Sequence, residues 1–270
     1  MKKQFIRLAG HLFPNAVVNM AFRSLTNPQV MKLRESEFSI LESATKANYF
    51  FEGFRIQTYT WGKGSKKVLL VHGWEGQAGN FSELINRLLL EDFTIYAFDG
   101  PSHGLSSRGP TSILAFTKLV GEMIRLYSVD RVVSHSFGAV ATTYALNTDQ
   151  DLELSKYALL TTPNEFAQRI DYVAEQVGIS TRIKEKLILK LEKELGVDVK
   201  ALKVSDWVQQ VKVKDALILH DKHDRVLPLY VSQEVNAKWD ACNLEEVEGT
   251  GHFKILKDKK VLERIVSFLA

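Results

Sequence analysis

Residues 132–140, Val-Val-Ser-His-Ser-Phe-Gly-Ala-Val, begin as an apolar strand-like run and end in a turn of small residues with Ser136 at its apex. Such a turn strains the serine backbone and brings the next helix close to the strand, so the residues two before and two after must be small. Gly138 meets that demand and Ser134 nearly does. The Phe137 N–H would point where the serine oxygen points, as an oxyanion donor must. The pattern is typical of a nucleophile, but it also suits an ordinary strand-to-helix turn.

The order of residues further along the chain favours the nucleophile interpretation. A serine nucleophile needs a histidine to take its proton and an acid to orient that histidine, and all three must come from loops at one edge of a scaffold. A buried-looking strand at 216–220 precedes Asp221 and Asp224, and a final strand at 244–248 precedes His252. Serine, acid and histidine can therefore meet at the carboxyl ends of three strands.

This order of serine, acid and histidine resembles that of α/β-hydrolase-fold serine hydrolases, and the resemblance extends from about residue 54 to the C-terminus. Residues 68–74, Val-Leu-Leu-Val-His-Gly-Trp, resemble the family's third strand and oxyanion loop, which implies that the Trp74 N–H is the second oxyanion donor. Residues 96–106 are similar to a strand and turn of the family that are structural more often than catalytic. Ser134 departs from the family pattern, because glycine is usual there.

The resemblance also distinguishes the two candidate acids. Val226 and Pro228 follow Asp224 at the family's usual offset, so Asp224 is expected to orient the histidine and Asp221 to be an exposed loop residue. A metal site on this loop is disfavoured because adjacent ligands on one short loop rarely converge. No cofactor is expected. The implied catalytic residues are Ser136, Asp224 and His252, and the implied oxyanion donors are the backbone N–H groups of Trp74 and Phe137.

The middle of the chain alternates helix and strand patterns, as a doubly wound sheet does. The predicted fold class is therefore α/β with a mostly parallel sheet, and the resemblance implies the α/β-hydrolase fold. Further strands are expected at 53–61 and from Lys66. The alternating part has predicted helices at 81–90, 111–127 and 138–146 and predicted strands at 93–98, 131–135 and 157–161.

Two segments lie outside this alternation. Apolar residues at helical spacing, interrupted by Pro14 and Pro28, predict an N-terminal helical extension over residues 1–50, followed by an α/β-hydrolase domain over 51–270. Residues from about 163 to 211 show one helical pattern after another, and the resemblance implies a small lid inserted after the sixth strand. The substrate-binding residues expected within this lid are Phe166, Tyr172 and Trp207.

Composition and charge limit the partners and the cellular compartment that are expected for this chain. The 270 residues, 45% of them hydrophobic, suit one large domain, and a net charge of +3 with dispersed cations predicts no nucleic-acid partner. The lone Cys242 cannot form an internal disulfide and favours a reducing compartment. Residues 1–3, Met-Lys-Lys, begin like a signal peptide, but polar residues interrupt the apolar run that should follow, so a cytoplasmic location is expected. Nothing firmly indicates a membrane partner, and the oligomeric state stays open.

The expected activity is hydrolysis of a carboxylic ester with a small or medium acyl chain through an acyl-enzyme on Ser136, and the expected partner is a small acyl substrate. Relatives with the same triad cleave thioesters and amides, and only the pocket distinguishes them. Thioester hydrolysis and aminopeptidase-like amide cleavage therefore stay open as alternatives. A non-catalytic protein of the same fold that binds a small molecule is a further alternative.

Overall fold

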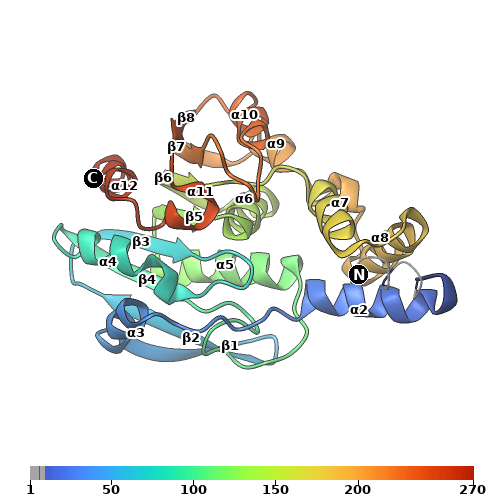
Figure 1. Cartoon of the computed structure of the whole chain (residues 1–270). Helices are drawn as coiled ribbons and strands as arrows, with labels where there is room; N and C mark the ends of the chain where they lie inside the picture. The colour runs from blue at the N-terminus through green and yellow to red at the C-terminus, as the bar shows by residue number, and fades with distance from the viewer. Residues whose placement is uncertain (1–5, 7–9) are drawn as a thin grey trace. The chain divides into compact units, whose positions relative to one another are not determined.

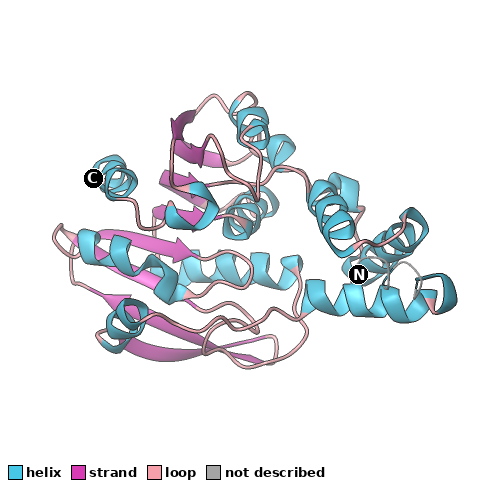
Figure 2. Ribbon diagram, viewed as in Figure 1, coloured by secondary structure: helices cyan, strands magenta, loops and turns pink. Residues whose placement is uncertain are grey.

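A computed structural model describes Ile6 and residues 10–270 of the chain. Within the described residues the strands form a single eight-stranded sheet of order β1-β2-β4-β3-β5-β6-β7-β8 (Figures 1 and 2). β1, β2 and β4 pair antiparallel, and every pair from β4 to β8 is parallel. The predicted mostly parallel, doubly wound sheet is confirmed.

The bounds of the strands and helices agree with most of the predicted elements. The strands are β1 (Thr45–Phe51), β2 (Phe54–Trp61), β3 (Lys66–Val71), β4 (Phe93–Phe98), β5 (Arg131–His135), β6 (Glu153–Leu160), β7 (Lys212–Asp221) and β8 (Cys242–Val247). The helices are α2 (Pro14–Thr26), α3 (Glu35–Glu42), α4 (Ser82–Leu88), α5 (Ile113–Tyr127), α6 (Phe137–Thr148), α7 (Phe166–Val177), α8 (Thr181–Leu195), α9 (Val204–Trp207), α10 (Tyr230–Asn236), α11 (Gly251–Lys254) and α12 (Lys259–Leu269). Short 3-10 turns occupy η1 (Ala78–Phe81) and η2 (Val199–Ala201).

The chain divides into two compact units. The smaller unit comprises Met1–Pro28, Pro110–Ser112 and Glu165–Lys203, and the larger unit comprises the rest, including the whole sheet. The helices α7 and α8 of the smaller unit follow β6, whereas residues 204–211, which were predicted to belong to the same insertion, are part of the larger unit.

The stretch from Thr45 to Phe51 differs from the expected helical extension, because it forms the edge strand β1. It pairs with β2 through a tight turn at Glu52 and Gly53, both of which have positive φ, of 43° and 83°. Two successive residues with positive φ are typical of hairpin turns whose twist matches that of the strands. The side chains of β1 are mostly exposed, so the strand shows no apolar alternation in the sequence.

Each unit has its own apolar packing. In the larger unit, apolar runs in the central strands are fully buried, with α4 and α12 over one face and α5 and α6 over the other (Figure 1). In the smaller unit, Val17 and Val18 of α2 pack against Ile183 of α8, while Ala21 joins a cluster with Leu187. No helix among the described residues combines the length and apolar character that crossing a bilayer requires.

Helix α6 begins so close to strand β3 that Gly138 has no room for a side chain. A Cβ atom there would lie 2.5 Å from the Val71 carbonyl oxygen and 2.6 Å from that of His72. Both obstacles are backbone atoms, which cannot move aside as a flexible side chain can. The small residue expected after Ser136 is therefore required by the packing of α6 against β3.

We expect Gly138→Ala to lower the free energy of unfolding by about 1–3 kcal/mol, because the added methyl group overpacks a rigid contact. Gly121→Ala is the matched control. It lies inside α5, and its Cβ would meet Leu152 Cδ1 at an ordinary 3.6 Å. Since alanine has a higher helix propensity than glycine, Gly121→Ala should raise the free energy of unfolding by up to about 1 kcal/mol. Urea unfolding of both variants measures the difference, and equal stabilities would contradict the packing argument.

Candidate active site

Ser136 stands at the junction of β5 and α6 with a strained backbone. Its φ of 52° and ψ of −119° fall in a region that residues other than glycine rarely adopt. The Ser136 N–H donates to the Leu160 carbonyl oxygen at 2.9 Å, which anchors the turn to the end of β6. Strain of this kind costs about 1–3 kcal/mol and persists at sites where the surrounding structure enforces it.

A row of hydrogen bonds leads from Ser136 to two residues that lie far away in the sequence. His252 Nε2 is 3.1 Å from Ser136 Oγ, and His252 Nδ1 is 2.8 Å from Asp224 Oδ2. Both His252 and Asp224 are buried. The structure thus brings together the three residues that the sequence selects as nucleophile, base and acid. We call this hydrogen-bonded set of Ser136, His252 and Asp224 the relay, and its geometry is the one that a serine nucleophile needs.

The loop that carries Asp224 is held by hydrogen bonds to its own backbone. Asp224 Oδ1 accepts from the N–H groups of Val226 at 2.7 Å and Leu227 at 3.0 Å. Burial raises the pKa of Asp224, but the bond from His252 and these backbone donors outweigh it, so the pKa lies below its usual value. Buried His220, whose Nε2–H donates to the Leu227 carbonyl oxygen at 2.9 Å, restrains the same loop.

Asp221 was expected to be an exposed loop residue, and this expectation is wrong. Its side chain is 1% exposed and accepts hydrogen bonds from the backbone N–H groups of His223, Thr250 and Gly251. Burial raises the pKa of Asp221, but these donors outweigh it and lower the pKa to about 2. This burial is not visible in the sequence, since Asp221 begins a run of polar residues.

The candidate oxyanion loop passes close to Ser136. It is a turn from Gly73 to Gly76, closed by a 3.0 Å hydrogen bond from the Gly76 N–H to the Gly73 carbonyl oxygen. A Cβ atom on Gly73 would lie 3.3 Å from Ser136 Cβ, so glycine permits this approach. The rings of Trp74 and Phe137 pack edge to face with centroids 5.3 Å apart. The two residues expected to donate to an oxyanion therefore lie side by side beside the serine.

The strand and turn at 96–106 have the structural role that the sequence suggested. Buried Asp99 accepts hydrogen bonds from Tyr59 Oη and from the backbone N–H groups of Ala78 and Leu105. It makes no contact with the relay and instead ties three segments of the larger unit together. Gly104 has a φ of 45°, and a Cβ there would lie 2.2 Å from the Asp99 carboxyl group.

The three expected substrate-binding residues do not belong to one unit. Phe166 packs against the apolar cluster of the smaller unit, and Tyr172 of the same unit is 36% exposed. Trp207 belongs to the larger unit, where it is only 7% exposed and stacks on Tyr144 with centroids 4.4 Å apart. Packing of this kind leaves little of the Trp207 surface for a substrate.

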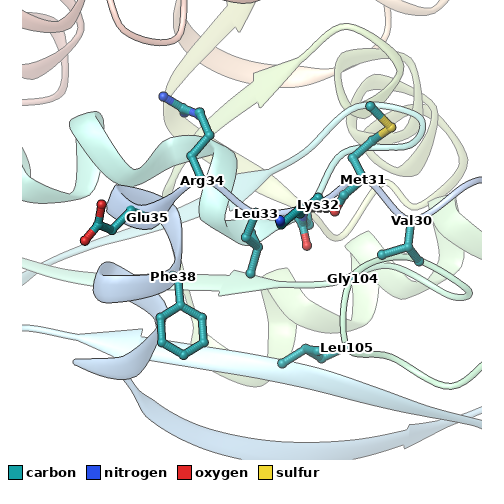
Figure 3. Close-up of a pocket in the computed structure, with 10 residues that line it drawn as sticks. Val30, Met31, Lys32, Leu33, Arg34, Glu35, Phe38, Gly104 and Leu105 are labelled. Carbon is teal, nitrogen blue, oxygen red and sulfur yellow. Dashed lines mark hydrogen bonds between the residues drawn. The ribbon is translucent and has the colours of Figure 1, made fainter.

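A pocket of about 460 Å³ lies in the larger unit (Figure 3). Its lining comes from the segment 30–35, helix α3 and the turn at 104–105, and it includes the exposed apolar side chains of Met31 and Phe38. Ser136 and His252 are not among the lining residues. This pocket therefore does not serve as evidence for a substrate site at the serine.

The comparisons with known proteins agree with the predicted fold. Residues 68–183 match the model of the alpha/beta hydrolase family. A probable serine hydrolase from Drosophila melanogaster is 31% identical over 107 residues, which cover 36% of this chain and 32% of that protein. An esterase from Pyrococcus furiosus has a TM-score of 0.67 at 15% identity, covering 91% of this chain and 97% of the esterase. An esterase from Exiguobacterium antarcticum has a TM-score of 0.65 at 18% identity, covering 81% of this chain and 96% of that esterase.

The sheet topology and these matches show that the chain has the α/β-hydrolase fold. The sequence matches further show that it is related to serine hydrolases. The chain spans about a third of the length of the curated relatives that it matches.

Two buried histidines near the site are kept neutral by their surroundings. Burial, followed by the nearby His252, lowers the pKa of His135 to about 3. Burial, followed by the nearby His72, lowers the pKa of His103 to about 2. In the unfolded chain each would bind a proton near its usual pKa of about 6.5. Between the folded and unfolded pKa values of each histidine, the unfolded state binds more protons than the folded state, so the free energy of unfolding rises with pH.

We expect the free energy of unfolding to fall as the pH is lowered from about 6 to about 4.5, by up to about 1.4 kcal/mol per pH unit for each such histidine. The low-pKa carboxylates Asp221 and Asp224 add to the loss only below about pH 4, near their unfolded pKa. His103→Gln removes one histidine and should make the slope shallower. Urea unfolding across this pH range measures the slope, and an unchanged slope would show that His103 is already protonated in the folded protein.

Proposed function

We propose that this protein is a serine esterase that cleaves a carboxylic ester with a small or medium acyl chain. The observation that carries the proposal is the hydrogen-bonded row of Ser136, His252 and Asp224. A serine hydroxyl is a weak nucleophile on its own and becomes effective when an adjacent base accepts its proton. The strained backbone of Ser136 supports the same conclusion, because a protein that only binds a ligand has no use for that strain.

In the proposed reaction His252 Nε2 takes the proton from Ser136 Oγ, which attacks the carbonyl carbon of the ester. The negative charge that develops on the carbonyl oxygen is stabilised by the N–H groups of Trp74 and Phe137, each contributing about 3 kcal/mol. The histidine then gives its proton to the leaving alcohol, and Asp224 stabilises the imidazolium. Water, activated by the same histidine, attacks the acyl-enzyme, releases the acid and restores the serine.

Ester cleavage is favoured over the other substrate classes by two observations. The candidate oxyanion loop has Trp74 directly after Gly73 in place of a run of glycines, and this arrangement resembles the esterase and lipase type. Two proteins with similar structures carry the name esterase. A curacin-pathway thioesterase domain also has this fold, with a TM-score of 0.61, so thioester hydrolysis is the second candidate.

We expect a fluorophosphonate probe to label Ser136 rapidly, because the probe reacts with an activated serine without needing the natural substrate. Ser136→Ala should abolish labelling. Ser134→Ala is the matched control, since Ser134 is buried two residues earlier and bonds to Tyr157 Oη. It should keep most of the labelling. Peptide mass spectrometry locates the modified residue, and a folded wild-type protein that stays unlabelled would exclude the proposed nucleophile.

We expect Asp224→Asn to lower kcat by about 10⁴-fold, because the amide favours the wrong histidine tautomer. The assay compares a p-nitrophenyl ester of a short acid with the matching anilide and the matching thioester. A wild-type preference for the ester supports the proposed substrate class, whereas faster thioester or anilide cleavage would replace it with the corresponding alternative. Activity of Asp224→Asn near that of the wild type would contradict its role as the acid.

A further inference from the structure

The carboxylate of Asp221 bridges two loops of the larger unit. Oδ2 accepts hydrogen bonds from the Thr250 N–H at 2.6 Å, from Thr250 Oγ1 at 3.0 Å and from the Gly251 N–H at 2.9 Å. Oδ1 accepts from the His223 N–H at 2.8 Å. Asp221 is the last residue of β7, so a rigid strand holds the point at which the two loops are joined.

Two of the bonded residues are immediate neighbours of proposed catalytic residues, and the third, Thr250, lies two positions before His252. His223 precedes Asp224, and Gly251 precedes His252. The carboxylate of Asp221 therefore fixes the acid loop through one oxygen and the histidine loop through the other. Its hydrogen bonds go to the two loops and not to the imidazole or to Ser136, so its structural link to the site runs through the loops.

The histidine loop needs such a restraint because its backbone is permissive. Gly249 and Gly251 flank Thr250, and both have positive φ, of 81° and 57°. Glycine populates many backbone conformations, so a loop with two glycines loses much entropy when a single conformation is fixed. Helix α11 contains only Gly251–Lys254 and is too short to order itself. The two N–H bonds and the hydroxyl bond to Asp221 select one conformation at this place.

A carboxylate suits this position better than its amide. All four donors point at its two oxygens, and charge-assisted hydrogen bonds are about twice as strong as neutral ones. An asparagine would keep one oxygen and place an NH₂ group against backbone N–H donors on the other side. One of the two loops would then lose its acceptor and face a buried donor without a partner, which costs about 1–3 kcal/mol.

We propose that Asp221 is a positioning residue that couples the acid loop to the histidine loop, so that His252 meets Ser136 and Asp224 at the same time. The proposal rests on the hydrolase function proposed above. A second restraint is the hydrogen bond from His135 Nε2–H to the His252 carbonyl oxygen at 2.9 Å. Positioning to within about 1 Å is worth about 100-fold in rate.

The test is the kinetics of fluorophosphonate labelling and of ester hydrolysis in Asp221→Asn. The maximal labelling rate and kcat should fall by about 10-fold to 100-fold, because the histidine is misplaced in the reacting complex. The half-saturating probe concentration and KM should change less than about twofold, because Asp221 has no contact with the substrate. A lesion that merely destabilises the fold would not produce this split at a temperature where the variant is fully folded.

Asp258→Asn is the matched control. The carboxylate of Asp258 also accepts two backbone N–H bonds, from Lys260 at 3.0 Å and Val261 at 3.1 Å, but it caps α12. This variant should lose stability and keep kcat. Thr250→Val removes the hydroxyl bond to Asp221 and leaves both N–H bonds, so it should lower kcat by a few fold with little loss of stability.

The outcomes separate the two proposals. A wild-type protein that is neither labelled nor active overturns the proposed function, and the role of Asp221 with it. A labelled wild type together with a folded Asp221→Asn of equal labelling rate overturns the positioning role alone. A loss of kcat in Asp258→Asn as large as that in Asp221→Asn also overturns it. If Asp221→Asn does not fold, Thr250→Val decides, and an unchanged kcat there counts against the proposal.

Discussion

The close approach of helix α6 to strand β3 is the constraint on which the candidate site depends. Gly138 has no room for a Cβ atom against the carbonyl oxygens at the end of β3, and Gly73 passes the Ser136 side chain almost as closely. With α6 held there, the chain must turn from β5 into the helix within one residue, and Ser136 takes the resulting strain at φ 52°. The same approach places Phe137 beside Trp74. Nucleophile and candidate oxyanion donors thus follow from a single packing contact.

The acid and histidine loops are organised by buried carboxylates that accept backbone N–H groups. A buried charge is tolerated only when its oxygens are satisfied, and here the chain itself provides the donors. Asp224 uses one oxygen for Val226 and Leu227 and leaves the other for His252. Asp221 uses both of its oxygens on the loops. This difference in what each carboxylate leaves free explains, without reference to a family pattern, which of the two can orient the histidine.

Many of the elements that were predicted correctly have a burial that is visible in the sequence. The apolar runs of β3, β5 and β7 and the small residues around Ser136 reflect packing that the chain cannot avoid. Strand β1 was missed because its side chains are exposed, so neither face shows an apolar pattern. Its turn at Glu52 and Gly53 was the one signal available. The burial of Asp221 was missed for a related reason, because the sequence of a polar loop does not reveal whether water or backbone N–H groups satisfy its side chains.

Ser134 shows how a departure from a family pattern can be absorbed by its neighbours. A serine at a position where glycine is usual adds a hydroxyl group to a fully buried place, and a buried hydroxyl without a partner would be costly. Ser134 Oγ–H donates to Tyr157 Oη at 3.0 Å, and Tyr157 Oη–H donates to the Ala139 carbonyl oxygen at 3.1 Å. The tyrosine of β6 therefore accommodates the serine and also holds the first turn of α6. Because Tyr157 satisfies the added hydroxyl group, Ser134 does not compete for the hydrogen bond between His252 and Ser136.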